Sequence, residues 1–265
     1  MRFNWKKILL CTVDVVIGGY LVVAVTAFNK PDESSLICRK VNIYIQDEVT
    51  NGFITTKEVK RRLDTSELQP IGKPLSAVNG REIEQMLEQS AFIKKAECSK
   101  TMDGTVNIWV SQRMPVVRIK SNNGDDYYVD DNDCVMPNSR YTSDLIIATG
   151  NISRSYATRY VSPLAKAINE SDLWRNQIEQ LNILPDHTVE IVPRVGDHVV
   201  NIGQLPTYRD KKYRDKAIKD YVGSQLERLR KFYVYGLSKA GWNKYSYINL
   251  EFCNQIICTK RSEKR

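Results

Sequence analysis

The stretch NGREIEQMLEQ, residues Asn79–Gln89, decides the fold of the first third of the chain. Its three apolar side chains, Ile83, Met86 and Leu87, fall three and four positions apart, and apart from Gly80 the other positions carry charged or amide side chains. Residues with this spacing lie on one face of an α-helix. The stretch therefore predicts an amphipathic helix that opens near Asn79 and packs its apolar face against another layer.

Strand patterns lie on both sides of this helix. Ile93–Lys100 and Thr105–Gln112 alternate around a short connection at Gly104, which predicts a β-hairpin. Earlier in the chain, Val41–Ile45 alternates apolar and polar residues, and the segment Thr55–Leu63 begins with a capping-type threonine and continues as a charged helix. The predicted order is strand, helix, helix, strand and strand, which is an α+β unit.

Short strands dominate after Arg113. The segments PVVRI, DDYYVDDNDCVMP and DLIIAT lead to a helical stretch near residues 162–170, and QLNIL, TVEIVPR and HVVNIG follow it. A long helix is predicted from about Asp210 to Tyr235. Its charged surface carries one apolar stripe, which predicts packing against a sheet; the stripe consists of Ile218, Val222, Leu226, Leu229 and Tyr233.

The C-terminal stretch YINLEFCNQIICT, residues Tyr247–Thr259, is predicted to be one continuous strand. In a single strand, Leu250, Phe252 and Ile256 share one face, so Phe252 is expected either to anchor a partner or to join the core beside Leu250. A closing strand followed by the charged tail 261–265 fits a sheet edge that is kept from self-association and can accept a partner strand.

The N-terminal segment predicts a membrane anchor. Residues Ile8–Phe28 are predominantly apolar, with Asp14 as the one charge, and as a helix they span about 31 Å. Cations at Arg2, Lys6 and Lys7 predict a cytoplasmic N-terminus. A cleaved signal peptide is the alternative, since Val25-Thr26-Ala27 resembles a processing site, but the apolar run is long for that role.

Composition excludes several classes of protein. The chain has 265 residues, of which 42% are hydrophobic and 26% charged, as in ordinary globular proteins with one or two domains. The net charge is +8, but acidic residues are interspersed among the cations, so no nucleic-acid partner is expected.

Catalytic and metal motifs are absent from the sequence. His187 and His198 are in strand-like segments without metal spacing, and they are expected to be surface or edge-strand residues. The acidic cluster of residues 125–133 lacks the glycine and glutamate of an EF-hand loop, and its DND segment is typical of a hairpin turn. The five cysteines after residue 30 have no zinc spacing and are expected to be buried apolar residues. We expect no enzyme activity, no cofactor and no metal site.

Taken together, these features give the sequence a resemblance to the bacterial cell-division family FtsQ/DivIB, and in particular to its members from Bacteroidetes. The resemblance rests on the domain order and on four blocks, taken in the family's order: QRMPVVRI at 112–119, YYVDDNDCVMP at 127–137, EIVPRVGDHVVNIG at 190–203, and GWNKYSYINLEFCNQIICTK at 241–260.

The resemblance implies an α+β protein with a single transmembrane helix, a POTRA-like βααββ domain and a strand-rich β domain with flanking helices. Its implied divisions are a cytoplasmic tail 1–7, a transmembrane helix 8–28, a linker 29–37, a POTRA-like domain 38–112, a β domain 113–260 and a charged tail 261–265. It also implies a single-pass type II protein of the cell inner membrane with its bulk in the periplasm.

The implied function is that of a divisome scaffold that binds FtsB/FtsL-type bitopic partners and other divisome proteins and links early to late division proteins. An FtsB segment would add as a strand at the last strands. The partner-binding residues implied there are Tyr247, Leu250, Glu251, Phe252, Asn254 and Ile256.

Two departures from the family pattern concern the charge and the aromatic residue of this site. Glu251 stands where the family often has a basic residue, and Phe252 stands where tyrosine is common. The charge pattern of the partner strand is therefore expected to differ from that of other family members. Two other functions remain open on the residues alone. One is a POTRA-containing secretion or envelope-assembly component that binds extended substrates, and the other is an exported hydrolase or calcium-binding protein.

Overall fold

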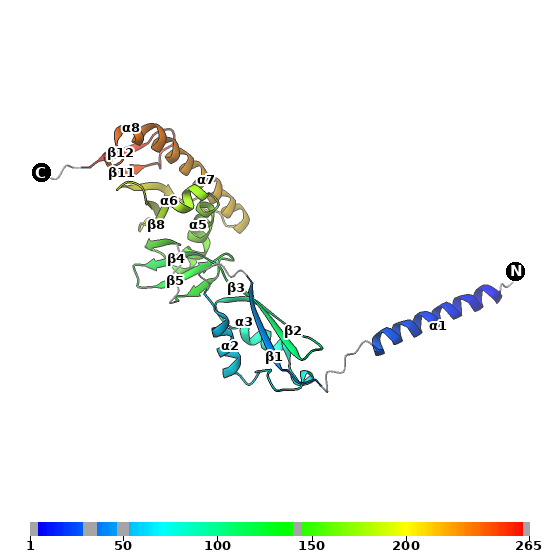
Figure 1. Cartoon of the computed structure of the whole chain (residues 1–265). Helices are drawn as coiled ribbons and strands as arrows, with labels where there is room; N and C mark the ends of the chain where they lie inside the picture. Colours follow the sequence, from blue (N-terminus) through cyan, green and yellow to red (C-terminus); the bar gives the residue numbers. More distant parts are fainter. Residues whose placement is uncertain (1–4, 29–35, 47–52, 140–144, 262–265) are drawn as a thin grey trace. The chain divides into compact units, whose positions relative to one another are not determined.

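The computed structural model describes residues 5–28, 36–46, 53–139 and 145–261. The chain divides into two compact units, of which the first comprises residues up to Gln46 together with Thr56–Gln89 and Lys95–Val110. The second comprises Asp47–Thr55, Ser90–Lys94 and Ser111 onward. Each unit has its own sheet (Figure 1).

The apolar N-terminal segment is helical, as the sequence predicts: helix α1 spans Trp5–Phe28. Among the described residues, however, no helix combines the length and the apolar character that crossing a membrane requires. The prediction of a transmembrane helix at 8–28 is therefore not confirmed. The predicted tail 1–7, linker 29–37 and tail 261–265 fall mostly outside the described residues.

The first unit has the predicted order of elements. Its three strands form a sheet in the order β1-β3-β2, and Figure 1 shows α2 and α3 together on one side of it. The elements are β1 (Lys40–Gln46), α2 (Thr56–Thr65), the 3-10 turn η1 (Leu75–Ala77), α3 (Gly80–Glu88), β2 (Ile93–Lys100) and β3 (Thr105–Gln112).

Local sequence explains how α3 begins and which face it buries. The side-chain oxygen of Asn79 accepts the backbone N–H of Glu82 at 3.4 Å, so Asn79 caps the helix. Ile83 and Leu87 are fully buried and Met86 is half-buried, which confirms the predicted apolar face. In β3, the alternate residues Val106, Ile108 and Val110 are fully buried, as the hairpin prediction requires.

The second unit contains the remaining elements. Its strands are β4 (Pro115–Ser121), β5 (Asp126–Asp130), β6 (Val135–Pro137), β7 (Ile146–Gly150), β8 (Ile178–Ile183), β9 (Thr188–Pro193), β10 (Val199–Gln204), β11 (Tyr245–Asn249) and β12 (Ile257–Lys260). Its helical segments are α4 (Arg154–Tyr156), the π-helical η2 (Ala157–Val161), α5 (Ser162–Asn169), α6 (Asp172–Gln177), α7 (Lys211–Phe232), the π-helical η3 (Tyr233–Leu237) and α8 (Ser238–Ala240).

All nine of these strands belong to one sheet, in the order β12-β11-β10-β9-β8-β7-β4-β5-β6. The pairs β10–β11, β4–β7 and β7–β8 are parallel, and the other neighbours are antiparallel. The first and last strands of this order, β12 and β6, are therefore the two edges of the sheet in the described residues.

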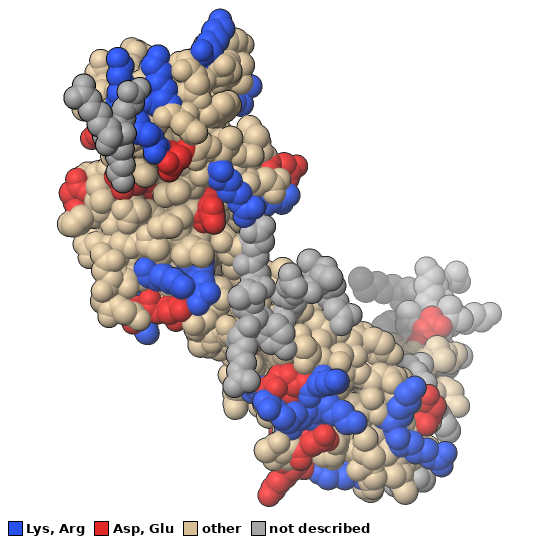
Figure 2. Space-filling view, turned by 60° about the vertical axis from the view of Figure 1, so that its left-hand side comes forward, with Lys and Arg blue, Asp and Glu red and all other residues tan. Residues whose placement is uncertain are grey.

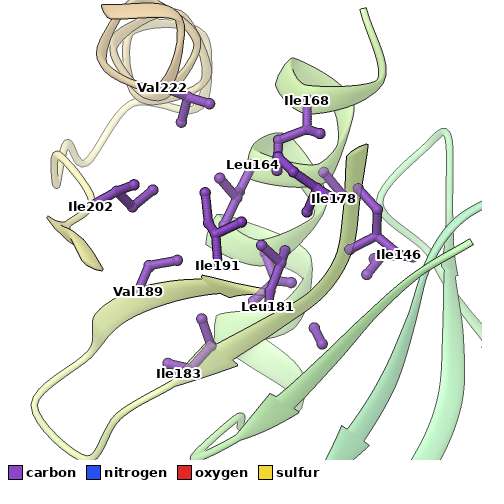
Figure 3. Packing of buried hydrophobic residues seen from close by; sticks show 14 of the residues in the cluster. Ile146, Leu164, Ile168, Ile178, Leu181, Ile183, Val189, Ile191, Ile202 and Val222 are labelled. Atoms are coloured by element: carbon purple, nitrogen blue, oxygen red, sulfur yellow. The ribbon is translucent and has the colours of Figure 1, made fainter. Parts of the chain in front are cut away.

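Helices α5 and α7 build the core on the sheet. Figure 3 shows Leu164 and Ile168 of α5 and Val222 of α7 directed toward strand side chains such as Ile191 and Ile202. All five residues are fully buried. The stripe predicted for α7 is buried along its whole length, which confirms that this helix packs on the sheet. Each large apolar side chain contributes about 1.5–3 kcal/mol by such burial.

The acidic cluster forms a hairpin turn and ion pairs. Residues 131–134 connect β5 to β6, and the DND segment lies in this turn as predicted, with Asp133 at a positive φ of 62°. The Asp133 carboxylate accepts from Ser162 and contacts the ammonium groups of Lys166 and Lys211 at 2.5 and 2.6 Å. In the described residues no cluster of three or more metal-ligating side chains occurs.

The pKa of Asp133 reflects this surrounding. Burial alone would raise the pKa of its carboxyl, but the hydrogen bonds from Lys166, Lys211 and Ser162 outweigh burial and hold the pKa below its ordinary value.

Elsewhere on the surface, Figure 2 shows basic and acidic side chains interspersed over the visible face. This pattern agrees with the mixed charge of the sequence.

Candidate partner-binding edge

Strand β12 is an edge strand, and β11 is the neighbour with which it pairs. The hydrogen bonds of β11 show which backbone groups of β12 point toward β11 and which point outward. The N–H of Leu250, just after β11, donates to the carbonyl of Asn201 in β10 at 2.8 Å. Because backbone groups alternate sides along a strand, Tyr247 and Asn249 bond in the opposite direction, toward β12.

The β11–β12 register then identifies the free groups of β12. Tyr247 lies opposite Thr259 and Asn249 opposite Ile257, so the backbone groups of Thr259 and Ile257 point to β11. The N–H of Arg261 donates to the carbonyl of Lys244 at 3.1 Å, so it also points toward the β11 side. The intervening Cys258 and Lys260 consequently present their N–H and C=O groups at the outer border of the sheet.

The prediction of one continuous strand from Tyr247 to Thr259 is wrong. The segment is a hairpin, in which β11 ends at Asn249 and β12 begins at Ile257. The predicted shared face is also wrong. Leu250 is fully buried, whereas Phe252 is 45% exposed and lies in the turn.

Two asparagines explain why the chain turns here. The side-chain oxygen of Asn249 accepts the N–H of Glu251 at 2.8 Å, which is an Asx turn. Asn254 adopts a φ of 61°, a left-handed conformation that asparagine tolerates better than most residues. Together they replace the strand by a turn at residues 250–256.

The turn is also held by Arg228 from α7. Its guanidinium donates to the carbonyl of Leu250 at 2.7 Å and to the carbonyls of Phe252 and Gln255 at 2.8 Å each. It donates to the side-chain oxygen of Gln225 at 2.7 Å as well. Hydrogen bonds from a charged group are stronger than neutral ones, so Arg228 fixes the shape of this turn.

The structure places the remaining residues of the predicted site in different environments. Glu251 and Asn254 are exposed beside Phe252, and Ile256 is half-buried and packs on the core. Tyr247 is half-buried, and its hydroxyl donates to Glu190 of β9 at 3.0 Å. Leu250 is therefore a core residue, while the exposed part of the predicted set lies in the turn.

The hydroxyl of Tyr247 belongs to a polar network on the open face of the sheet. Glu190 also accepts from the Asn182 amide at 2.8 Å, and Gln180 donates to Thr149 at 2.9 Å in the adjoining strands. Burial raises the pKa of the Tyr247 hydroxyl to about 12, and its hydrogen bond to Glu190 adds to this effect. The hydroxyl of Tyr247 is thus protonated and engaged within the protein.

An open groove next to the turn was missed by the sequence analysis. It has a volume of about 510 Å³, and it is formed by the C-terminal end of α7, η3 and the turn. Its lining includes Arg228, Phe232, Tyr235 and Ile256. Tyr235 is exposed, as is Ile257 at the start of β12. In the sequence, Arg228 is one of many cations on a charged helix, so only its tertiary contacts distinguish it.

A buried histidine lies near the same end of the sheet. His198 is only 4% exposed, so the expectation of a surface or edge-strand residue is wrong for it. Its Nε2 is 2.7 Å from the Tyr233 hydroxyl. Burial lowers the pKa of His198; Asp197 acts in the opposite direction, and Arg261 adds to the lowering. Arg261 also pairs with Asp197, which attaches the end of β12 to the loop before β10.

The cysteines differ from the expectation in part. Cys38 is buried and Cys98 and Cys258 are half-buried, but Cys134 and Cys253 are exposed. Both exposed cysteines lie in or next to turns, where neighbouring strands do not cover them. All five are free thiols.

The comparisons with known proteins agree with this architecture. A family model described as "FtsQ/DivIB, C-terminal related" matches residues 114–259, and a model described as "POTRA-like domain" matches residues 36–111. No curated protein matches the chain. The first model covers more than half of the sequence and includes the nine-stranded sheet up to Thr259 in β12. The chain therefore belongs to the FtsQ/DivIB family of bacterial cell-division proteins.

Proposed function

We propose that this chain is a non-enzymatic scaffold of the divisome, and that an extended segment of an FtsB/FtsL-type partner adds to β12 as a tenth strand. The observation that carries the proposal is the outer border of β12, where the backbone groups of Cys258 and Lys260 point away from β11 and pair with no other strand in the described part of the chain. Strand addition draws its affinity from such main-chain groups. Family membership supports the role in cell division.

Side chains beside this border supply specificity. Phe252 is exposed in the turn and Ile257 at the start of β12, and the groove at Tyr235 is lined by the turn residue Asn254, which lies between them in the sequence. Large aromatic residues dominate the energetics of most interfaces. In this proposal Phe252 is the aromatic anchor, and Glu251 and Asn254 are polar contacts around it.

The same proposal includes how the chain is anchored in the membrane and in which compartment each segment lies. Residues 8–28 anchor the chain in the inner membrane, supported by 21 successive residues with Asp14 as the one charge. The N-terminal cations keep the tail 1–7 in the cytoplasm, and the POTRA-like domain 38–112 and the β domain 113–260 work in the periplasm.

The border of β12 can be tested by removing a single N–H group. Cys258→Pro removes the outward N–H of the strand, while proline is tolerated on an edge strand when its nitrogen faces solvent. Cys258→Val is the matched control, since it keeps the N–H and a similar apolar volume. The measurement is capture of a purified FtsB/FtsL-type pair by the full-length chain in detergent, alongside the urea midpoint of each variant.

We expect Cys258→Pro to weaken capture at least tenfold relative to Cys258→Val, at similar urea midpoints. Equal capture by the two variants would show that the partner does not use the border of β12. A proline variant that unfolds is replaced by Lys260→Pro, with Lys260→Ala as its control, because Lys260 is exposed and its N–H also points outward.

A further inference from the structure

The sheet of the first unit also has an edge strand, and side chains of the same unit accept hydrogen bonds from its outward backbone N–H groups. Strand β2 is last in the order β1-β3-β2. The N–H of Cys98 donates to the carboxylate of Glu84 at 2.7 Å, and the N–H of Ala96 donates to the carboxylate of Glu88 at 3.1 Å. Both carboxylates come from α3. Two successive outward N–H groups of the edge are thus occupied from within the chain.

The spacing of the two glutamates matches the spacing of the two amides. Residues four apart in an α-helix are separated by about 6 Å along its axis. Residues two apart in a strand are separated by about 6.6 Å. Glu84 bonds to Cys98 and Glu88 to Ala96, so α3 runs antiparallel to β2 and offers one acceptor to each outward amide. The helix takes the place of a neighbouring strand for these two groups.

Packing holds α3 in this position. A Cβ atom at Gly80 would lie 3.4 Å from the Cys98 sulfur, so the start of α3 lies directly against β2. Ile83 and Leu87 of the same helix are fully buried. Burial raises the pKa of the Cys98 thiol to about 11, and the nearby charge of Glu84 adds to the effect. The thiol and the carboxylate therefore share one half-buried environment.

The charged side chains of β2 are complementary to those of a second, antiparallel copy of the same strand. Lys95 and Glu97 alternate with the buried Ala96, so they lie on the opposite, exposed face of the strand, where they form an ion pair at 2.5 Å. In an antiparallel pair centred on Ala96, Lys95 of each copy lies opposite Glu97 of the other. In the neighbouring register, centred on Glu97, two like charges would oppose each other, which is destabilising.

We propose that Glu84 and Glu88 form a carboxylate latch that closes the edge of β2, and that the unlatched edge pairs antiparallel with β2 of a second copy, centred on Ala96. The latch keeps the POTRA-like unit from self-association through a free border, a hazard that exposed edges carry. This proposal shares no residue with the β12 border and does not rest on the scaffold function.

The first test compares two double variants of the full-length chain in detergent. E84A/E88A removes both acceptors and keeps good helix formers in α3. E84Q/E88Q is the matched control, because each glutamine keeps a side-chain oxygen that can accept the same N–H. Hydrogen exchange of the Ala96 and Cys98 amides reports the latch, and sedimentation velocity reports association.

We expect slow exchange of both amides in the wild type and in E84Q/E88Q. In E84A/E88A, we expect a monomer–dimer equilibrium at micromolar concentration that the other two proteins lack. Fast exchange of these amides in the wild type, or the same sedimentation for all three folded proteins, would overturn the proposal. Dimerisation of E84Q/E88Q to the same extent would overturn it as well.

The second test addresses the register. In the E84A/E88A background, K95E places like charges opposite each other and is expected to abolish the dimer, while K95E together with E97K restores the complementary pairs and the dimer. A dimer that ignores the charges at 95 and 97 would rule out pairing centred on Ala96. If E84A/E88A proves too unstable, the exchange rates of the wild type alone still decide whether the latch exists. Loss of FtsB/FtsL capture in the β12 variants has no bearing on either result.

Discussion

The guanidinium of Arg228 donates to the carbonyl of Leu250 at 2.7 Å, at the point where β11 ends and the chain turns toward β12. The same group bonds to the carbonyls of Phe252 and Gln255, so one side chain of α7 sets the path of the whole turn. The exposed side chain of Phe252 and the start of β12 depend on this path. The proposed partner site is therefore shaped by a residue that the partner need not touch.

We predict that Arg228→Met loosens the turn without unfolding the sheet. Hydrogen bonds from a charged group contribute about 1.5–3 kcal/mol each, and part of that is regained when water solvates the freed carbonyls, so we expect a loss of about 2 kcal/mol in the free energy of unfolding. Urea denaturation measures this loss. Partner capture should fall more steeply than stability, because the turn that presents Phe252 is no longer fixed.

Arg230→Met is the control for this prediction. Arg230 is on the same helix two residues later, but it is exposed and pairs with Glu227 on α7 itself. An exposed pair of this kind contributes little, so the control should retain both stability and capture. Equal effects of the two substitutions would mean that loss of a positive charge on α7, rather than loss of the turn contacts, causes the change.

We predict that Phe252→Asp abolishes capture of an FtsB/FtsL-type partner and changes the free energy of unfolding by no more than about 0.5 kcal/mol. The side chain is 45% exposed and in a turn, and surface substitutions generally have effects of that size. Phe252→Tyr should keep capture, since it preserves the ring. Undiminished capture by the aspartate variant in a pull-down would remove Phe252 from the site.

The sequence predicts well those elements whose signal is local and long. The stripe of α7, the apolar face of α3 and the hairpin of β2 and β3 all match the structure, because several turns or alternations repeat the same pattern. The closing hairpin was missed, since alternating apolar residues continue through the turn and imitate a strand. What breaks that strand is partly local, at Asn254, and partly Arg228, more than twenty residues earlier in the chain. Such a tertiary contact has no signature in a single sequence.

We predict that Tyr247→Phe lowers the free energy of unfolding by about 1 kcal/mol, the usual contribution of one hydrogen bond, and leaves partner capture intact. The hydroxyl is engaged with Glu190, so a partner can use only the ring, which phenylalanine retains. Asn182 continues to donate to Glu190 in the variant. Urea denaturation and the pull-down measure the two effects. Loss of capture with unchanged stability would show that the hydroxyl contacts the partner instead.

The last prediction concerns acid stability and His198. Because burial lowers the folded-state pKa of His198 below its ordinary 6.5, the unfolded chain binds the proton first as the pH falls. The neutral histidine thus contributes its full stability above pH 6.5, and this contribution is lost as the pH falls from 6.5 through the folded-state pKa. We expect the urea midpoint of the wild type to drop between pH 7.5 and 5.0.

His198→Gln should show a smaller drop over the same range, because glutamine stays neutral and can still hydrogen-bond to the Tyr233 hydroxyl. His187→Asn is the matched control: His187 is exposed and has a φ of 66°, which asparagine tolerates, so this variant should keep the pH dependence of the wild type. Identical pH profiles for the wild type and His198→Gln would assign the acid sensitivity to other groups. Since His198 contacts Tyr233 and directly follows Asp197, whose ion pair with Arg261 attaches β12, protonation of His198 is also expected to loosen the border where the partner strand adds.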